Sequence, residues 1–220
     1  MTETDDAEPQ PSPERLAAAY DLAAEEYHRW IPDMSADPPV NRALVTAFAE
    51  LVAGTGNRRA VEAGCGTGRV TARLAELGLD IRGFDLSPGM VAVAGRQHPR
   101  LDFGVAPLHR LPVADGSLGG VVAWYSIIHT APADLPAVFT EFRRVLAPGG
   151  FVLLASQAGT GTRRIRDFYR QDVRLNAYLT TPEALVEPLA ATGFDEYARM
   201  VAPAPDAAGC AGMVMIARRR

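Results

Sequence analysis

Lysine is absent from this 220-residue chain, and all 22 of its basic residues are arginine. Schiff-base chemistry and phosphate-loop binding through lysine are therefore excluded, because both require the amine. Cysteine is nearly absent too. Cys65 and Cys210 are isolated in the sequence, so they predict neither a metal site nor a disulfide framework, and a reducing compartment is the simpler expectation.

Long apolar runs and a positive net charge are also lacking. No stretch approaches the roughly 20 apolar residues that cross a bilayer, and residues 1–13 have neither the basic start nor the apolar run of a secretory signal. The formal net charge of −4 provides no positive field for nucleic acid or an anionic membrane. We therefore expect a cytoplasmic protein with neither kind of partner.

The residues that are present suit one globular domain. Apolar residues make up 48% of the chain, which is enough for a core at this length. Residues 1–11 are acidic and predict a disordered tail, and residues 12–220 predict one domain, because the length leaves no room for two. Within it, residues 12–56 predict two helices, and residues 157–180 predict a partly helical insertion without an obvious strand.

Short apolar runs alternate with helical stretches from residue 59 onward, a pattern typical of βαβ units and a parallel sheet. The expected strands of this region are Arg59–Ala63, Asp80–Phe84, Leu101–Val105, Gly120–Tyr125 and Phe151–Ser156. Two more, Phe194–Val201 and Ala211–Ala217, are joined by a short connection and predict a hairpin. The fold class is therefore α/β, with a mostly parallel sheet and an antiparallel last strand.

A glycine-rich turn follows the first expected strand. Gly64, Gly66 and Gly68 carry no side chain where the backbone must turn and where a ligand can approach main-chain N–H groups. A tight turn that binds nothing is the alternative. Asp85 ends the next strand 21 residues after Gly64, near the separation of about 20 at which dinucleotide folds place a ribose-binding carboxylate. Its alternative role is to cap a helix.

The glycine spacing distinguishes two classes of ligand. The turn reads GxGxG, and Arg69 stands where the dinucleotide fingerprint GxGxxG has its third glycine. Glu62 adds a carboxylate that repels a phosphate and attracts an ammonium group. A nucleoside with a cationic amino-acid tail therefore fits better than a nicotinamide dinucleotide, and an oxidoreductase is the less favoured hypothesis.

Four blocks of the sequence resemble class I S-adenosylmethionine-dependent methyltransferases of the small-molecule type. They are Val61–Gly68, Gly83–Met90, Leu111–Ser117 and Glu141–Gly150. The resemblance implies a Rossmann-like fold with helices on both faces of the sheet and an N-terminal helical lid over residues 12–56. It implies S-adenosylmethionine as the cofactor, with its methionine part wrapped by the glycine turn and Cys65, its amino group near Glu62 and its ribose on Asp85.

The resemblance also indicates where adenine lies. Leu86 and Met90 are expected beside it. Relatives often have a polar residue after the third strand, whereas residues 105–108 are apolar here, so backbone atoms and packing against Ala106 and Leu108 are expected to hold adenine. Tyr125, at the carboxyl end of the fourth strand, is expected in the cofactor site as well.

His129 is the candidate for a general base or for a group that orients the acceptor. It follows the fourth strand at the carboxyl edge of the sheet, and imidazole can take a proton near neutral pH. A loop histidine bonded only to backbone is the alternative. Tyr20 and Tyr27 resemble the lid helix of small-molecule methyltransferases, in which the first tyrosine closes over the cofactor. Core packing is their alternative role.

Acceptor binding is expected from aromatic residues of the lid and of the insertion, which would cover the site. These candidates, together with His129, are Tyr27, Trp30, Tyr169 and Tyr178. Arg163, Arg164 and Arg166 are expected on a solvated face. The function predicted is in-line transfer of the sulfonium methyl group to a small, partly apolar acceptor. A protein that binds the cofactor without transferring methyl is the alternative, since fold does not decide activity.

Overall fold

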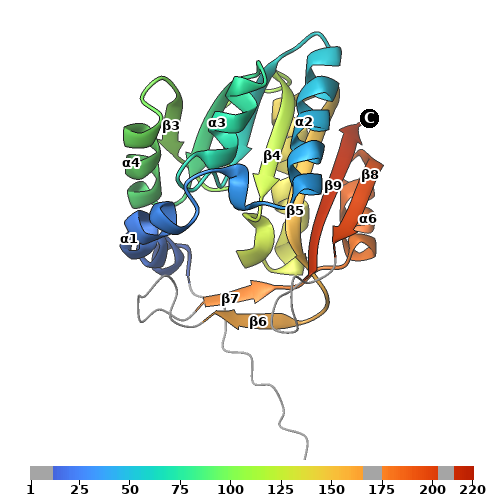
Figure 1. Cartoon of the computed structure of the whole chain (residues 1–220). Coiled ribbons are helices and arrows are strands. Elements are labelled where there is room, and N and C mark those ends of the chain that lie inside the picture. The colour runs from blue at the N-terminus through green and yellow to red at the C-terminus, as the bar shows by residue number, and fades with distance from the viewer. Residues whose placement is uncertain (1–11, 166–174, 203–210) are drawn as a thin grey trace, which may run out of the picture.

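The computed structural model describes residues 12–165, 175–202 and 211–220, which form a central sheet with helices packed on it (Figure 1). The strand order is β3-β2-β1-β4-β5-β9-β8. The bounds are β1 Arg59–Ala63, β2 Asp80–Asp85, β3 Asp102–Val105, β4 Leu118–Trp124, β5 Leu146–Ala158, β8 Phe194–Ala202 and β9 Ala211–Arg219. β1 to β5 run parallel, and β9 lies antiparallel between β5 and β8. This confirms the expected fold class.

Helices cover both faces of the sheet, as expected. Successive residues of a strand point to opposite faces. Val121 of β4 packs in the cluster formed with α5 (Leu135–Val145) and α6 (Pro182–Ala191), whereas Val122 packs with α2 (Pro39–Gly54) and α3 (Arg69–Glu76). Each face therefore has its own apolar core. No helix among the described residues is both long and apolar enough to cross a membrane.

Local signals determine where several helices begin. α1 (Pro13–Trp30), α4 (Pro88–Gln97) and α6 each have proline at the first helical position, where its missing N–H costs nothing. The side chain of Ser87, just before α4, accepts a hydrogen bond from the Met90 N–H. Ser12 and Thr181 cap α1 and α6 in the same way. These caps place the helix starts where the sequence predicted them.

The segment after β5 differs from the expected partly helical insertion. Its described part forms a two-stranded antiparallel sheet of β6 (Thr162–Ile165) and β7 (Leu175–Tyr178). Each strand has four residues, and polar side chains such as Arg163 and Asn176 obscure the apolar alternation that would reveal it. Figure 1 places this sheet at the same end of the molecule as α1. Residues 1–11 and 166–174 lie outside the described residues.

Candidate active site

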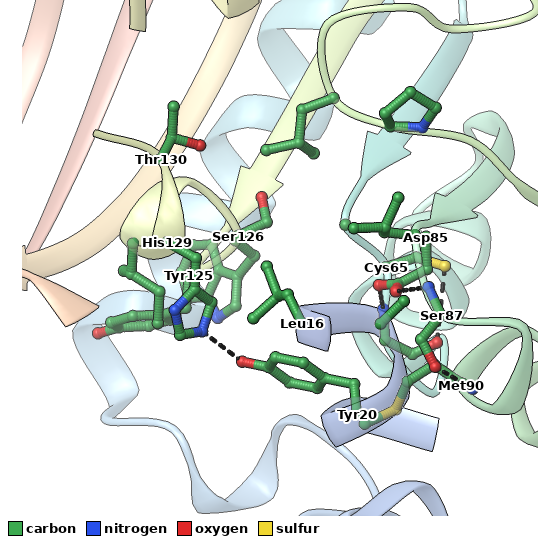
Figure 2. Close-up of a pocket in the computed structure, with 18 of the residues that line it drawn as sticks. Leu16, Tyr20, Cys65, Asp85, Ser87, Met90, Tyr125, Ser126, His129 and Thr130 are labelled. Carbon is green, nitrogen blue, oxygen red and sulfur yellow. Dashed lines mark hydrogen bonds between the residues drawn. The ribbon is translucent and has the colours of Figure 1, made fainter. Parts of the chain in front are cut away.

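A cavity of about 890 Å³ lies at the carboxyl ends of the parallel strands, the edge at which open α/β sheets bind ligands. The turn after β1 and the end of β2 line it, as do the loop after β4, α1 and β6. Figure 2 shows Asp85, Cys65 and Met90 on one side of the cavity and His129 and Tyr125 on the other. The volume is within the usual range for small-molecule sites.

Glycine in the turn after β1 allows this turn to contact the loop after β4. Gly64 has a φ of 78°, and a Cβ at this position would lie 2.2 Å from the Cβ of Ser126 in the loop after β4. Only glycine fits there, because any side chain would meet both steric and backbone strain. The Ser126 hydroxyl donates to the Ala63 carbonyl at 2.7 Å and holds the loop in this position. Gly64, Cys65 and Gly66 all line the cavity.

Gly68 is placed differently from the other glycines. It is not among the residues that line the cavity, although it was expected to wrap the methionine part of the cofactor. It precedes α3 with a φ of 84°, and a Cβ there would lie 2.8 Å from the Phe103 ring. Gly68 therefore allows the chain to enter α3 and to pack against β3, and its contact with the cofactor stays a prediction.

Asp85 is held by the backbone of the glycine turn. Its carboxylate accepts hydrogen bonds from the N–H of Gly66 at 2.8 Å and from that of Ser87 at 2.9 Å. Burial raises the pKa of Asp85, and these N–H donors act in the opposite direction. A carboxylate has about four acceptor positions, so Asp85 can still accept from two ligand hydroxyls. Ser87, rather than Asp85, caps α4.

Glu62 and Arg69 line the cavity together. Glu62 is buried on β1 and accepts a hydrogen bond from the Thr71 hydroxyl, and burial raises its pKa to about 8. Arg69 is ion-paired with Asp37. This role of Arg69 is not visible in the sequence, because its partner Asp37 lies 32 residues earlier in the chain and is brought near by folding alone.

Tyr27 lies in the cavity wall beside Arg69. It lines the cavity, is hydrogen-bonded to Arg69 and feels the charges of Asp37 and Glu62. Burial raises the pKa of its phenol, so the hydroxyl stays neutral. Tyr27 thus lies beside the Asp37–Arg69 ion pair, and its expected contact with the acceptor stays a prediction.

Apolar side chains line the cavity next to Asp85. The Ala106 N–H donates to the Asp85 carbonyl at 2.9 Å, and the Met90 N–H donates to the Ser87 hydroxyl at 3.0 Å. The cavity-lining residues in this region that were expected around adenine are Leu86, Met90, Ala106 and Leu108.

Tyr125 has an unusual backbone conformation. Among the described residues it is the only one besides glycine with a positive φ, at 55°. Such a conformation costs about 1–3 kcal/mol and is found most often at functional sites. The Tyr125 N–H donates to the Ala155 carbonyl at 3.0 Å, which keeps the residue at the end of β4 and in the cavity wall.

Tyr20 and His129 are hydrogen-bonded to each other, and His129 is also hydrogen-bonded to β7. The Tyr20 hydroxyl and His129 Nε2 are 2.7 Å apart, and His129 Nδ1 is 2.7 Å from the Asn176 carbonyl of β7. A carbonyl only accepts, so Nδ1 carries the proton and Nε2 accepts from Tyr20. Burial lowers the pKa of His129, which keeps the ring neutral. His129 is thus bonded to more than backbone (Figure 2).

The lid helix α1 is anchored at one more point. The carboxylate of Asp21 accepts hydrogen bonds from the Ser87 hydroxyl and, at 2.7 Å, from the Gly89 N–H at the start of α4. A negative charge is favourable at a helix N-terminus. No sequence pattern indicates this role of Asp21, because its partners are more than 60 residues away in the chain.

Two expected acceptor residues are not among those that line the cavity. Trp30 is 60% exposed at the end of α1. Tyr178 lies opposite Thr162 across the β6–β7 pair, and alternation turns it to the face away from Arg163. Tyr169 lies outside the described residues. Arg163 lines the cavity, contrary to expectation, whereas Arg164 is exposed as expected.

Known proteins share this fold and these sequence blocks. Residues 60–150 match the family model of the methyltransferase domain. This central part of the chain is therefore similar to methyltransferase domains, and it makes up less than half of the 220 residues. The malonyl-[acyl-carrier protein] O-methyltransferase of Serratia marcescens is 29% identical over 122 residues, which cover 54% of this chain and 47% of that protein. The match to such curated methyltransferases thus spans about half of their length or less.

Solved structures extend the likeness in fold along almost the whole chain. The [4+2]-cyclase SpnF superposes with a TM-score of 0.74 at 19% identity and covers 96% of this chain and 98% of its own. The Burkholderia thailandensis 1,6-didemethyltoxoflavin-N1-methyltransferase, solved with 1,6-didemethyltoxoflavin and S-adenosylhomocysteine, has a TM-score of 0.67 at 24% identity. It covers 96% of this chain and 92% of its own.

Proposed function

We propose that this protein transfers a methyl group from S-adenosylmethionine to a small, partly apolar acceptor. The observation that carries the proposal is one cavity that combines a nucleoside-type binding wall with a proton-accepting side-chain pair. Glu62, Asp85 and the glycine turn line the first part, and Tyr20 and His129 line the second. A cofactor and an acceptor can therefore meet without leaving the cavity.

The residues of the first part fit the cofactor. Asp85 has free acceptor positions for ribose hydroxyls. Glu62, ionised beside a bound cation, suits the amino group of an amino acid. Arg69 is ion-paired with Asp37, and its remaining N–H donors suit the carboxylate of that amino acid. The Thr67 hydroxyl is buried, lines the cavity and has no hydrogen-bond partner among the described residues. A buried hydroxyl of this kind is costly unless a ligand satisfies it.

The cofactor, when bound, supplies an electrophilic methyl group on a sulfonium sulfur. The protein must then align the acceptor and remove its proton where the nucleophile is a hydroxyl or an acidic carbon. Tyr20 is placed to accept that proton on its oxygen while its own proton passes to His129 Nε2. The Asn176 carbonyl, which accepts from Nδ1, stabilises the resulting imidazolium.

The second part of the cavity is mostly apolar, which indicates the character of the acceptor. Side chains of the lid, of the loop after β4 and of α5 line it, and they include Leu16, Ala17, Ile128, Ala137 and Val138. α1 covers this part and limits the access of water, since Asp21 and Tyr20 tie the helix to α4 and to the loop after β4.

Calorimetric titration tests the cofactor part of the proposal. We expect micromolar affinity, about −8 kcal/mol, for S-adenosylmethionine and S-adenosylhomocysteine, and no binding of reduced nicotinamide dinucleotide. A screen of small acceptors with methyl-labelled cofactor then tests transfer. Absence of cofactor binding would contradict the proposal.

Binding without methyl transfer is the second candidate function. The [4+2]-cyclase SpnF shares the fold over 96% of this chain, so the fold itself does not require transfer. The labelled screen separates the two candidates. A labelled product supports transfer, whereas an altered acceptor that carries no label supports the second candidate.

A further inference from the structure

Arg163 brings a positive charge into the part of the cavity that the proposed function gives to the acceptor. On β6, Arg163 and Ile165 line the cavity, and the residues opposite them on β7, Ala177 and Leu175, are buried. Cross-strand partners point to the same face of a ribbon. One face of the β6–β7 sheet therefore faces the cavity, and Arg163 is the charged residue on it.

The guanidinium of Arg163 is oriented but not neutralised. Its Nε donates to the side-chain oxygen of Gln157 at 3.1 Å, and Gln157 also lines the cavity. No carboxylate of the described residues is ion-paired with Arg163, whereas the other cavity arginine, Arg69, is paired with Asp37. Asp134 lines the cavity as well, but it is exposed at the start of α5, where solvent screens its charge.

Arg163 and the proton-accepting pair are supported by the same small sheet. The Asn176 carbonyl that holds His129 belongs to β7, and the next β7 residue, Ala177, lies directly opposite Arg163. A group bound to Arg163 is thus held close to the Tyr20–His129 pair. Because Gln157 occupies the Nε edge, the terminal nitrogens remain to form the two parallel hydrogen bonds that arginine makes with a planar oxyanion.

We propose that Arg163 binds an anionic group of the acceptor, a carboxylate or a phosphate, and so selects acceptors that are apolar on one side and anionic on the other. The inference rests on the proposed function, since it assigns the acceptor to this part of the cavity. It also explains why a guanidinium that has no carboxylate partner among the described residues is kept in a largely apolar wall, where a bound anion would offset its desolvation.

Paired aromatic probes that differ in charge test this inference. Equilibrium dialysis, with and without saturating S-adenosylhomocysteine, would compare para-hydroxybenzoate with para-hydroxybenzamide and phenyl phosphate with phenol. We expect the anionic member of at least one pair to bind about tenfold more tightly, which corresponds to about 1.4 kcal/mol. The pair that discriminates shows whether carboxylate or phosphate is preferred.

Two neighbouring substitutions supply the matched comparison. Arg163→Gln should abolish the preference for the anion, whereas Arg164→Gln, which alters the adjacent exposed residue, should retain it. Affinity for S-adenosylhomocysteine and the midpoint of thermal unfolding should be unchanged in both variants. The inference is overturned if the wild type has no such preference, if Arg163→Gln retains it, or if no probe binds at about 10 mM, where a millimolar Kd would still be detected.

The cofactor titration distinguishes this failure from failure of the proposed function. If S-adenosylhomocysteine binds and the anionic preference is absent, only the role of Arg163 is wrong. If S-adenosylhomocysteine does not bind, the proposed function itself is wrong, and the dialysis without cofactor still shows whether Arg163 binds anions.

Discussion

Asp85 and His129 illustrate how single side chains obtain their roles from their neighbours. The carboxylate of Asp85 is oriented by the N–H groups of Gly66 and Ser87, so it faces the cavity in one conformation. The ring of His129 is held by Asn176 and Tyr20, which together select one tautomer. Preorganised groups of this kind lose little entropy when a ligand binds.

Replacing Asp85 by alanine should weaken binding of S-adenosylmethionine by at least about 1–2 kcal/mol, because hydrogen bonds to a charged group are lost. Titration calorimetry measures the change. Asp80→Ala, at the exposed start of the same strand, is the matched control and should bind as the wild type does. Unchanged affinity in a folded Asp85→Ala variant would show that the ribose does not bind at Asp85.

Replacing Tyr20 by phenylalanine or His129 by glutamine should reduce turnover about 10²–10⁴-fold, the usual contribution of a general base. Cofactor affinity should be nearly unchanged, because Tyr20→Phe keeps the aromatic ring that packs with Met90, and His129 lies across the cavity from Asp85. Steady-state kinetics with an acceptor found in the screen, together with cofactor titration, tests this. Equal losses of turnover and of cofactor affinity would assign the pair to lid closure instead.

The helices of this protein were predictable because their signals are local, whereas the β6–β7 sheet was not. α1, α4 and α6 begin where serine or threonine precedes a proline, and their apolar spacing is visible in the sequence. β6 and β7 pair although residues 166–174 separate them in the sequence, and both strands are short and partly polar. Pairing of this kind depends on what the ribbon packs against, and a sequence pattern does not report it.

Replacing Asp21 by alanine should loosen α1 from α4, because the bonds to Ser87 and to the Gly89 N–H are lost. The loss should be about 1–3 kcal/mol of local stability. Hydrogen exchange measures it as faster exchange of the α1 amides, with the central strands unaffected. Arg15→Ala, at the exposed start of the same helix, serves as the control. Unchanged exchange in Asp21→Ala would mean that apolar packing alone holds the lid.

For the whole molecule, the buried carboxyl of Glu62 links stability to pH. Its pKa is about 8 in the folded protein against 4.5 for an exposed glutamate, so the folded state binds more protons between these values. The free energy of unfolding of the ligand-free protein should therefore fall as pH rises from about 5 to 8. Urea unfolding at several pH values measures this, and Glu62→Gln should flatten the dependence.

The same carboxyl should make cofactor binding depend on pH in the opposite sense. A cationic amino group beside Glu62 favours its ionised form, so binding releases a proton and the affinity should rise as pH increases from about 6 to 8. Calorimetry in two buffers of different ionisation enthalpy would count the protons released. No proton release, or an affinity that is flat with pH, would place the amino group elsewhere.

The sequence alone determined the fold class and the resemblance to methyltransferases, and it predicted the residues that line one wall of the cavity. Those features depend on periodic apolar residues, on helix caps and on a glycine turn followed by Asp85 at a set spacing, all of which are local in the chain. Tertiary structure decided the rest. It brought Asp37 to Arg69, Tyr20 to His129 and Arg163 into the cavity, since these contacts join segments that only the packed sheet and lid bring together.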